Sequence, residues 1–208
     1  MSDAERAGDQ HVRPAEPAAL LGVVLAGGKS TRMGVDKATL PHIDGAGGAT
    51  RSYLEHAVAR LIPVVRRVAV SGRPWTGSAD VVGLPDEQAD LGPAMGVATA
   101  LRYAAGQRLA GVLVTPVDMP DITSEHLRRL VQAWSQTGNV VCASFDRQRA
   151  EPLLAVYPQA ALADLEQVLA SPGRSLSRWI DSVQAIRVDL PADVGRNVNR
   201  PSDRWETK

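Results

Sequence analysis

The 208-residue chain has a single cysteine, 4% aromatic side chains and no excess of either charge. One cysteine excludes an internal disulfide and a zinc-finger set of ligands. The 23 Lys and Arg residues equal the 23 Asp and Glu residues, so the chain lacks the basic excess that non-specific binding to nucleic acid requires. No apolar run approaches the ~18 residues of a membrane-spanning helix. We therefore expect no nucleic-acid partner and no membrane partner.

Residues 1–17 are polar, rich in Ala and interrupted by Pro, and they lack the apolar block of a secretory signal. We predict that this segment is a disordered tail and that the protein is cytoplasmic. Residues 18–208 are predicted to form a single domain, because their number suits one domain and 44% of the chain is hydrophobic.

The periodicity of the apolar residues predicts strands that alternate with helices. Continuous apolar runs indicate buried strands at 20–26, 68–70, 111–114, 140–143 and 153–156. Amphipathic patterns indicate helices that begin after the capping residues Ser52 and Thr123, at residue 94, at Pro158 and after Ser175. This alternation favours an α/β fold, a three-layer α/β/α domain with a mostly parallel, Rossmann-like sheet. Cys142 falls within a predicted strand and is interpreted as a small core residue.

The loop after the first predicted strand combines adjacent glycines with cations. Gly27 and Gly28 allow a ligand to approach the backbone closely, and consecutive N–H groups there can bind an anion. Three cations follow within nine residues, at Lys29, Arg32 and Lys37. Because ligands bind at the carboxyl ends of the strands in such a sheet, the loop predicts a site for a polyanion such as a triphosphate.

Two common phosphate motifs do not fit this loop. The P-loop has four residues between its glycines and then Gly-Lys-Ser/Thr, whereas here five residues separate Gly28 from Gly34 and Val35 follows. The dinucleotide fingerprint requires glycines that are spaced rather than adjacent. An ordinary glycine-rich turn with surface cations is the alternative interpretation.

Three motifs of the chain resemble those of one enzyme family. They are Leu25-Ala-Gly-Gly-x-Ser-x-Arg-Met-Gly-x-Asp-Lys37, Thr115-Pro-Val-Asp118-Met-Pro120 and Gly195-Arg-Asn197-Val-Asn199-Arg-Pro201. Together they are similar to the motifs of the molybdenum cofactor guanylyltransferases, which have a nucleotidyltransferase fold of the nucleotide-diphospho-sugar transferase type. The resemblance implies a Mg²⁺-dependent enzyme that transfers GMP from GTP to the phosphate of Mo-molybdopterin and releases pyrophosphate. It also implies transient contact with proteins that make or accept the cofactor.

The same resemblance implies roles for residues of the glycine loop. Lys37 would hold the substrate phosphates and Arg32 the departing pyrophosphate. Asp86 would lie beside the guanine or the ribose, although a simple loop carboxylate is the alternative interpretation. The nucleotide would also contact the backbone of the segment formed by Leu25, Ala26, Gly27 and Gly28.

Asp118 follows an apolar strand and is predicted to emerge at the carboxyl edge of the sheet, where Mg²⁺ could bind it together with phosphate oxygens. Asn197 and Asn199 alternate, so on an extended segment their side chains face the same way. The resemblance makes both asparagines substrate-binding residues and Asn199 a further metal ligand. The alternative interpretation is structural: Asp118 would form a turn before a helix, and Asn197 and Asn199 would lie in a polar C-terminal turn. Arg174, at the start of a short helix, would bind the pterin phosphate or stay in solvent.

The chain departs from the family pattern at two places. Ser71 stands where many relatives have an amide side chain near the nucleotide, and the segment 41–50 is longer and richer in Gly than usual. These departures leave open a related transferase that uses CTP, another nucleotide or another phosphorylated acceptor. A module that binds GTP without turnover is the alternative that is not an enzyme.

Overall fold

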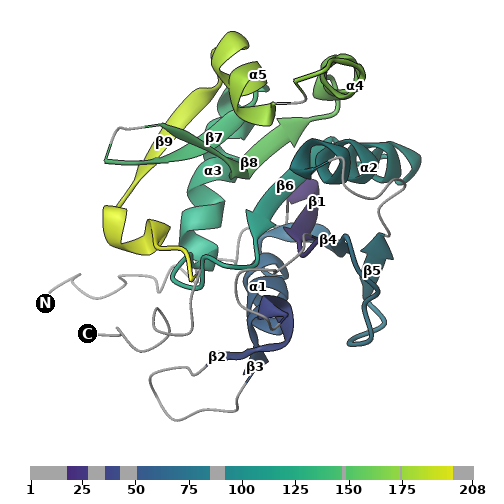
Figure 1. Cartoon of the computed structure of the whole chain (residues 1–208), viewed down its shortest axis with the longest axis vertical. Helices are drawn as coiled ribbons and strands as arrows, with labels where there is room; N and C mark the ends of the chain where they lie inside the picture. The colour runs from purple at the N-terminus through teal and green to yellow at the C-terminus, as the bar shows by residue number, and fades with distance from the viewer. Residues whose placement is uncertain are drawn as a thin grey trace, which may run out of the picture.

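The computed structural model describes residues 18–27, 36–42, 51–84, 92–146, 149–173 and 175–198. Within them, a seven-stranded sheet has the strand order β5-β4-β1-β6-β8-β7-β9 (Figure 1). Its strands are β1 (Ala18–Leu25), β4 (Val65–Ser71), β5 (Val81–Leu84), β6 (Gly111–Pro116), β7 (Val141–Phe145), β8 (Ala150–Pro158) and β9 (Ile186–Leu190). A short antiparallel pair, β2 (Pro41–His42) and β3 (Arg51–Ser52), lies outside this sheet.

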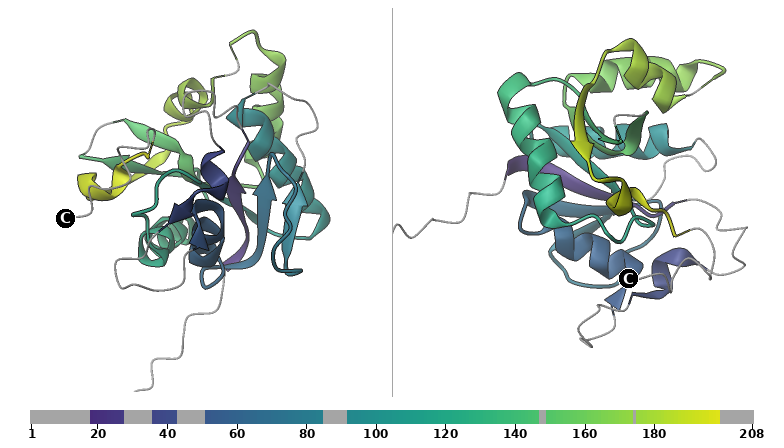
Figure 2. Two further views of the ribbon diagram at one scale, coloured as in Figure 1. Left: turned by 60° about the horizontal axis from the view of Figure 1, so that its bottom comes forward. Right: turned by 90° about the vertical axis from the view of Figure 1, so that its left-hand side faces the viewer.

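Helices cover both faces of the sheet (Figure 2). The helices α1 (Tyr53–Leu61) and α3 (Ser124–Thr137) pack on one face. The other face carries α2 (Pro93–Gly106), α4 (Ala161–Ala170) and α5 (Leu176–Ser182). Two short 3₁₀ helices, η1 (Lys37–Thr39) and η2 (Ala192–Gly195), complete the described elements. The predicted three-layer α/β/α architecture is confirmed.

The central strand β1 is buried on both faces because its residues supply two separate cores. Leu20 and Val24 belong to the core under α1 and α3, while Leu21 and Val23 belong to the core under α2. The strands β5, β4, β1 and β6 are mutually parallel, whereas β8 is antiparallel to both of its neighbours. The sheet is therefore mostly parallel, as predicted.

The ends of two helices follow the predicted capping chemistry. The Ser52 hydroxyl accepts a hydrogen bond from the backbone N–H of Glu55 (3.2 Å), and the backbone N–H of Ser52 donates to the Glu55 carboxylate (2.7 Å). Thr123 and His126 make the same reciprocal arrangement at the start of α3. Both predicted N-termini are confirmed, and these caps satisfy N–H groups that the helices cannot pair internally.

One predicted boundary is wrong. Pro158 does not open a helix but is the last residue of β8, paired with Gly111 of β6. The next residue, Gln159, still donates its N–H to Ala110 O (2.9 Å), so α4 begins only at Ala161. Pairing of β8 with residues 111–114 of β6 thus overrides the local preference of Pro for a first helical position.

None of the described helices has the length and apolarity needed to cross a membrane. The predicted disordered tail, residues 1–17, lies outside the described residues.

Candidate functional site

Three neighbouring parallel strands end together at one edge of the sheet. Leu25, the last residue of β1, is aligned with Ser71 at the end of β4 and with Pro116 at the end of β6. Just beyond β1, the N–H of Ala26 donates to Ser71 O (3.0 Å). The predicted nucleotide-binding segment and Ser71 therefore lie side by side, and Asp118 follows two residues after β6 at the same edge.

The far end of the glycine loop returns to this edge. Asp36 pairs with Arg73, whose Nη2 lies 2.6 Å from Asp36 Oδ2 and which follows β4 by two residues. The other carboxylate oxygen of Asp36 accepts the N–H of Ala38 (3.1 Å). The hydrogen bond from Arg73 lowers the pKa of the Asp36 carboxyl. Lys37 begins η1 directly after Asp36, so the loop that leaves β1 at Gly27 starts and ends beside the same strands.

The first turn of α2 packs tightly against the carboxyl ends of β1 and β4. A Cβ added at Gly96 would lie 3.0 Å from Leu25 Cδ2 and 3.2 Å from Ser71 Oγ. Glycine at this position therefore allows the helix N-terminus to approach the ends of β1 and β4. The partial positive charge of a helix N-terminus favours anionic ligands.

Asn197 is brought to Asp118 by a backbone contact. The N–H of Val198, which follows β9 and η2, donates to Asp118 O (2.9 Å), and the Val198 side chain is buried. This contact places the exposed Asn197 beside the loop that carries Asp118. The family resemblance assigns both residues to one site.

Glu151 also lies near Asp118, and the sequence predicted no role for it. Glu151 is the second residue of β8, the antiparallel neighbour of β6, and its carboxyl lies close enough to Asp118 to be affected by the charge of that residue. Burial raises the pKa of the Glu151 carboxyl, and the charge of Asp118 raises it further. The N–H of Leu153 donates to Glu151 Oε1 (3.0 Å) and acts in the opposite direction. Two carboxyl groups thus lie near each other beside the end of β6.

This donor set fits Mg²⁺. A half-buried Asp118 with a second carboxylate near it carries a repulsion that a divalent cation would relieve. No group of three or more His, Cys, Asp or Glu that could enclose a metal occurs among the described residues. Mg²⁺ does not need one, since it commonly binds one or two carboxylates and completes its shell with waters and phosphate oxygens.

The structure thus brings together six of the predicted site residues: Leu25, Ala26, Gly27, Ser71, Asp118 and Asn197. Lys37 joins them through its backbone position. The remaining predicted site residues lie outside the described residues; they are Gly28, Arg32, Asp86, Arg174 and Asn199.

Comparison with known proteins gives a consistent result. A family model described as a MobA-like NTP transferase domain matches residues 22–186. A probable molybdenum cofactor guanylyltransferase from Rhodopirellula baltica is 40% identical over 198 residues, which cover 91% of this chain and 92% of that protein. A protein of the same description from Mycobacterium tuberculosis is 40% identical over 176 residues, covering 81% of this chain and 83% of that protein.

Solved structures with lower identity share the fold. Molybdopterin-guanine dinucleotide biosynthesis protein A from Archaeoglobus fulgidus superposes with a TM-score of 0.67 at 21% identity, covering 89% of this chain and 95% of that chain. The 2-C-methyl-D-erythritol 4-phosphate cytidylyltransferase from Thermus thermophilus superposes with a TM-score of 0.58 at 20% identity, with the same coverage of 89% and 95%.

Proposed function

We infer the reaction from one premise, that this chain belongs to the family of MobA-like NTP transferases and is an enzyme of the nucleotidyltransferase class. We propose that it transfers GMP from GTP to the phosphate of Mo-molybdopterin, releases pyrophosphate and depends on Mg²⁺. We place this reaction in the cytoplasm, with transient contact to proteins that make or accept the cofactor. The guanylyl assignment is supported by relatives of that description at 40% identity that align over more than 80% of this chain.

The observation that carries the proposal is the position of Asp118. It lies at the carboxyl edge beside the end of β1, with Glu151 near it and Asn197 held next to it by Val198. A triphosphate bound along Leu25 to Gly27 would reach this carboxylate across one strand spacing, about 4.8 Å.

The proposed GMP transfer requires that the two substrates be positioned and their charges neutralised, and it does not require a strong base. The attacking phosphate monoester is already largely ionised at neutral pH, because its second pKa is about 6. Its oxygen forms a bond to the α-phosphorus of GTP while the bond to the bridging oxygen breaks, and pyrophosphate leaves with that electron pair. Bound Mg²⁺ would neutralise the charge that develops on the phosphate oxygens.

The family resemblance supplies the proposed roles of the other residues. Lys37 and Arg32 hold the phosphates and the departing pyrophosphate, while Asp118 and Asn199 hold Mg²⁺. The nucleoside lies against the backbone of Leu25 to Gly28 with Ser71 and Asp86 near it. The acceptor contacts Asn197 and Arg174.

The first prediction concerns Asp118→Asn, which keeps the side-chain shape and removes the charge. We expect GMP transfer to fall by at least about 100-fold, since a bound metal ion contributes several kcal/mol to such reactions. The measurement is pyrophosphate release from GTP with Mg²⁺ and Mo-molybdopterin at saturating substrate. The matched control is Asp164→Asn on the exposed face of α4, which should retain wild-type activity.

A panel of nucleotides with the same acceptor tests the base. GTP should give the fastest release of pyrophosphate. A faster reaction with CTP would replace the guanylyl assignment by a cytidylyl one, and wild-type activity of Asp118→Asn would remove this carboxylate from the metal site.

A further inference from the structure

Arg60 is a buried cation at the end of α1, outside the site residues named so far. Its side chain is 6% exposed, and its neighbours along the helix, Ala57 and Leu61, are fully buried in the core between α1 and the sheet. A guanidinium in such surroundings is costly unless its donors are used.

One amino group of Arg60 binds the loop that follows β6. Its Nη1 donates to the backbone carbonyls of Met119 (2.7 Å), Pro120 (3.1 Å) and Ile122 (2.6 Å). Hydrogen bonds from a charged donor are about twice as strong as neutral ones. A single group therefore bonds three carbonyls within four residues, and the carbonyl of Pro120 also lies 3.1 Å from His56 Nε2.

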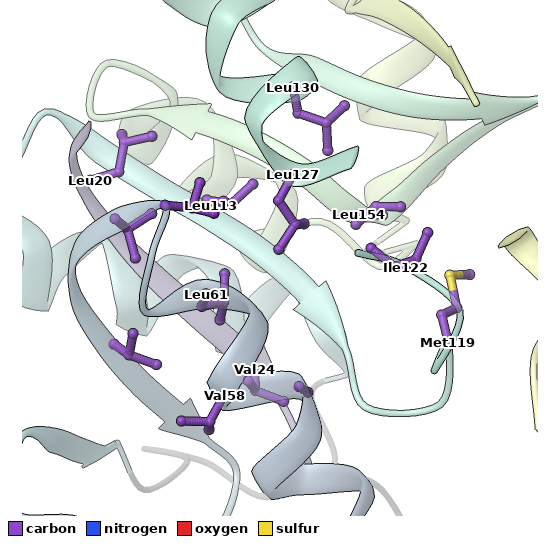
Figure 3. Packing of buried hydrophobic residues seen from close by; sticks show 14 of the residues in the cluster. Leu20, Val24, Val58, Leu61, Leu113, Met119, Ile122, Leu127, Leu130 and Leu154 are labelled. Carbon is purple, nitrogen blue, oxygen red and sulfur yellow. The ribbon is translucent and has the colours of Figure 1, made fainter. Parts of the chain in front are cut away.

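These carbonyls belong to the loop that carries Asp118. The side chains of Met119 and Ile122 reach into the core that Leu127 and Leu154 also form, as Figure 3 shows. Side-chain packing thus anchors the loop from its apolar side, while Arg60 holds its backbone. From the C-terminal segment, the N–H of Val198 binds the carbonyl of Asp118 itself (2.9 Å).

The guanidinium keeps its charge while doing this. Burial lowers the pKa of Arg60 to about 10, with Asp121 acting in the opposite direction, so the group stays protonated at neutral pH. Within the part of the chain that the structure describes, Nε and Nη2 of Arg60 have no hydrogen-bond partner. The hydrogen bonds that the Arg60 guanidinium makes are therefore those from Nη1 to the backbone of the Asp118 loop.

We propose that Arg60 is a positioning residue of the nucleotidyl-transfer site: it holds the loop 117–123 in the one shape that presents the Asp118 carboxylate at the edge next to Leu25 to Gly27. The inference rests on the proposed function, in which Asp118 binds Mg²⁺. Arg60 itself touches neither substrate nor metal, and it acts through the loop.

The test compares substitutions that preserve the helix. Met, Gln and Lys are all good helix formers, so α1 should form in each variant. Arg60→Met removes every donor, Arg60→Gln keeps a shorter neutral donor, and Arg60→Lys keeps a charged donor with three protons. The matched control is Ser124→Ala. It deletes the hydrogen bond that Ser124 Oγ, at the start of α3, donates to the backbone carbonyl of Arg60 in α1 (2.8 Å), and it leaves the Arg60 side chain intact.

We expect a specific loss of metal-dependent function. In Arg60→Met, kcat should fall and the half-saturating Mg²⁺ concentration should rise, each by about 10-fold to 100-fold, as is typical when support of a metal ligand is lost. KM for GTP should change by less than about threefold, since the nucleotide is held mainly by the β1 loop. Arg60→Lys should recover most of the loss, and Ser124→Ala should match the wild type in all three quantities.

Two measurements that do not depend on activity accompany the kinetics. Titration of Mn²⁺ followed by electron paramagnetic resonance, with GTP present, should show the same weakening of metal binding in Arg60→Met. Amide hydrogen exchange of the segment 117–123 should be faster in that variant, while the exchange of α2 stays at the wild-type rate. If Arg60→Met does not fold, the same measurements on Arg60→Gln decide the question.

The outcomes separate this inference from the proposed function. Wild-type Mg²⁺ dependence in folded Arg60→Met or Arg60→Gln, with Asp118→Asn inactive, would overturn the positioning role alone. Activity of Asp118→Asn at the wild-type level would overturn the metal assignment and the positioning role with it. Equal losses in Arg60→Met and Ser124→Ala would show that Arg60 contributes only general stability.

Discussion

Cys142 is a thiol that the fold makes unreactive by burying it. Its side chain is fully buried in β7, and burial raises the pKa of the thiol to about 12, with the charge of Glu151 adding to the effect. Because the thiolate is the reactive form, the native protein should not react with an aromatic disulfide reagent at pH 8 over an hour. In denaturant the same reagent should release one equivalent of thiolate at once. Rapid modification of the native protein would instead show that β7 opens readily.

Single residues of the site were predictable where they belong to a motif and unpredictable where they depend on burial. Asp118 and Asn197 follow from motifs in the sequence, and the structure brings them together. The nearness of Glu151 to Asp118 depends on β8 lying antiparallel beside β6, which no local pattern determines. Arg60 lies in an amphipathic helical pattern, where an arginine is normally expected in solvent. Its buried position results from the carbonyls of a loop 59 to 62 residues away in sequence.

At the scale of the element, the cap of α3 is sensitive to pH. The N–H of Thr123 donates to His126 Nδ1 (3.2 Å), so the imidazole must be unprotonated at that nitrogen. Burial and the charge of Arg129 lower the pKa of His126 below its ordinary value of 6.5, partly opposed by Glu125 and Asp193. The unfolded chain then binds a proton more readily than the folded one. Stability should therefore fall as the pH drops below about 6.5 and level off below the lower folded pKa.

Replacing His126 tests this cap. His126→Glu creates the usual Thr-x-x-Glu capping box and places a negative charge at the helix N-terminus, so it should add about 0.5–1 kcal/mol to the free energy of unfolding at pH 7.5. His126→Gln keeps an acceptor that does not titrate near neutrality and serves as the control. Urea denaturation at pH 7.5 and 5.5 measures both effects. If His126→Gln lost as much stability as the wild type between these pH values, another group would account for the loss.

The elements that the sequence predicts best are those that are buried all round or capped by side chains. β1 and β6 are continuous apolar runs, and the residues of β6 are buried throughout. β9 was not predicted because the exposed Arg187 and Asp189 alternate with only three apolar residues, Ile186, Val188 and Leu190, a pattern that suits an edge strand. β5 has only four residues at the opposite edge. Short edge strands form because a neighbouring strand pairs with them, and the partner of β9 is β7, which β8 and two helices separate from it in sequence.

At the scale of the whole molecule, the layers follow from the sequence but the strand order does not. Alternating strand and helix patterns determine that helices must cover a sheet. The insertion of the antiparallel β8 between β6 and β7 is a tertiary choice, and it brings Glu151 to Asp118. The site therefore has a parallel half, β5-β4-β1-β6, that carries the proposed nucleotide segment. Its mixed half, β8-β7-β9, is followed by the segment that carries Asn197.

Because both halves would contact the same ligand, binding should stabilise the molecule as a unit. A ligand that binds only the native state adds about 2.7 kcal/mol at a concentration 100 times its Kd. For a chain of this size each kcal/mol raises Tm by roughly 2–4 °C, so GTP with Mg²⁺ should raise Tm by about 5–10 °C.

Without Mg²⁺, in the presence of a chelator, the triphosphate meets Asp118 and Glu151 with no cation between them, and the increase in Tm should fall to less than half. Differential scanning fluorimetry with GTP, CTP and GDP measures these shifts, and Asp118→Asn should lose the part that depends on Mg²⁺. An equal shift with and without Mg²⁺ would mean that the nucleotide binds away from the two carboxylates, and the edge formed by β1 and β6 would then not be its site.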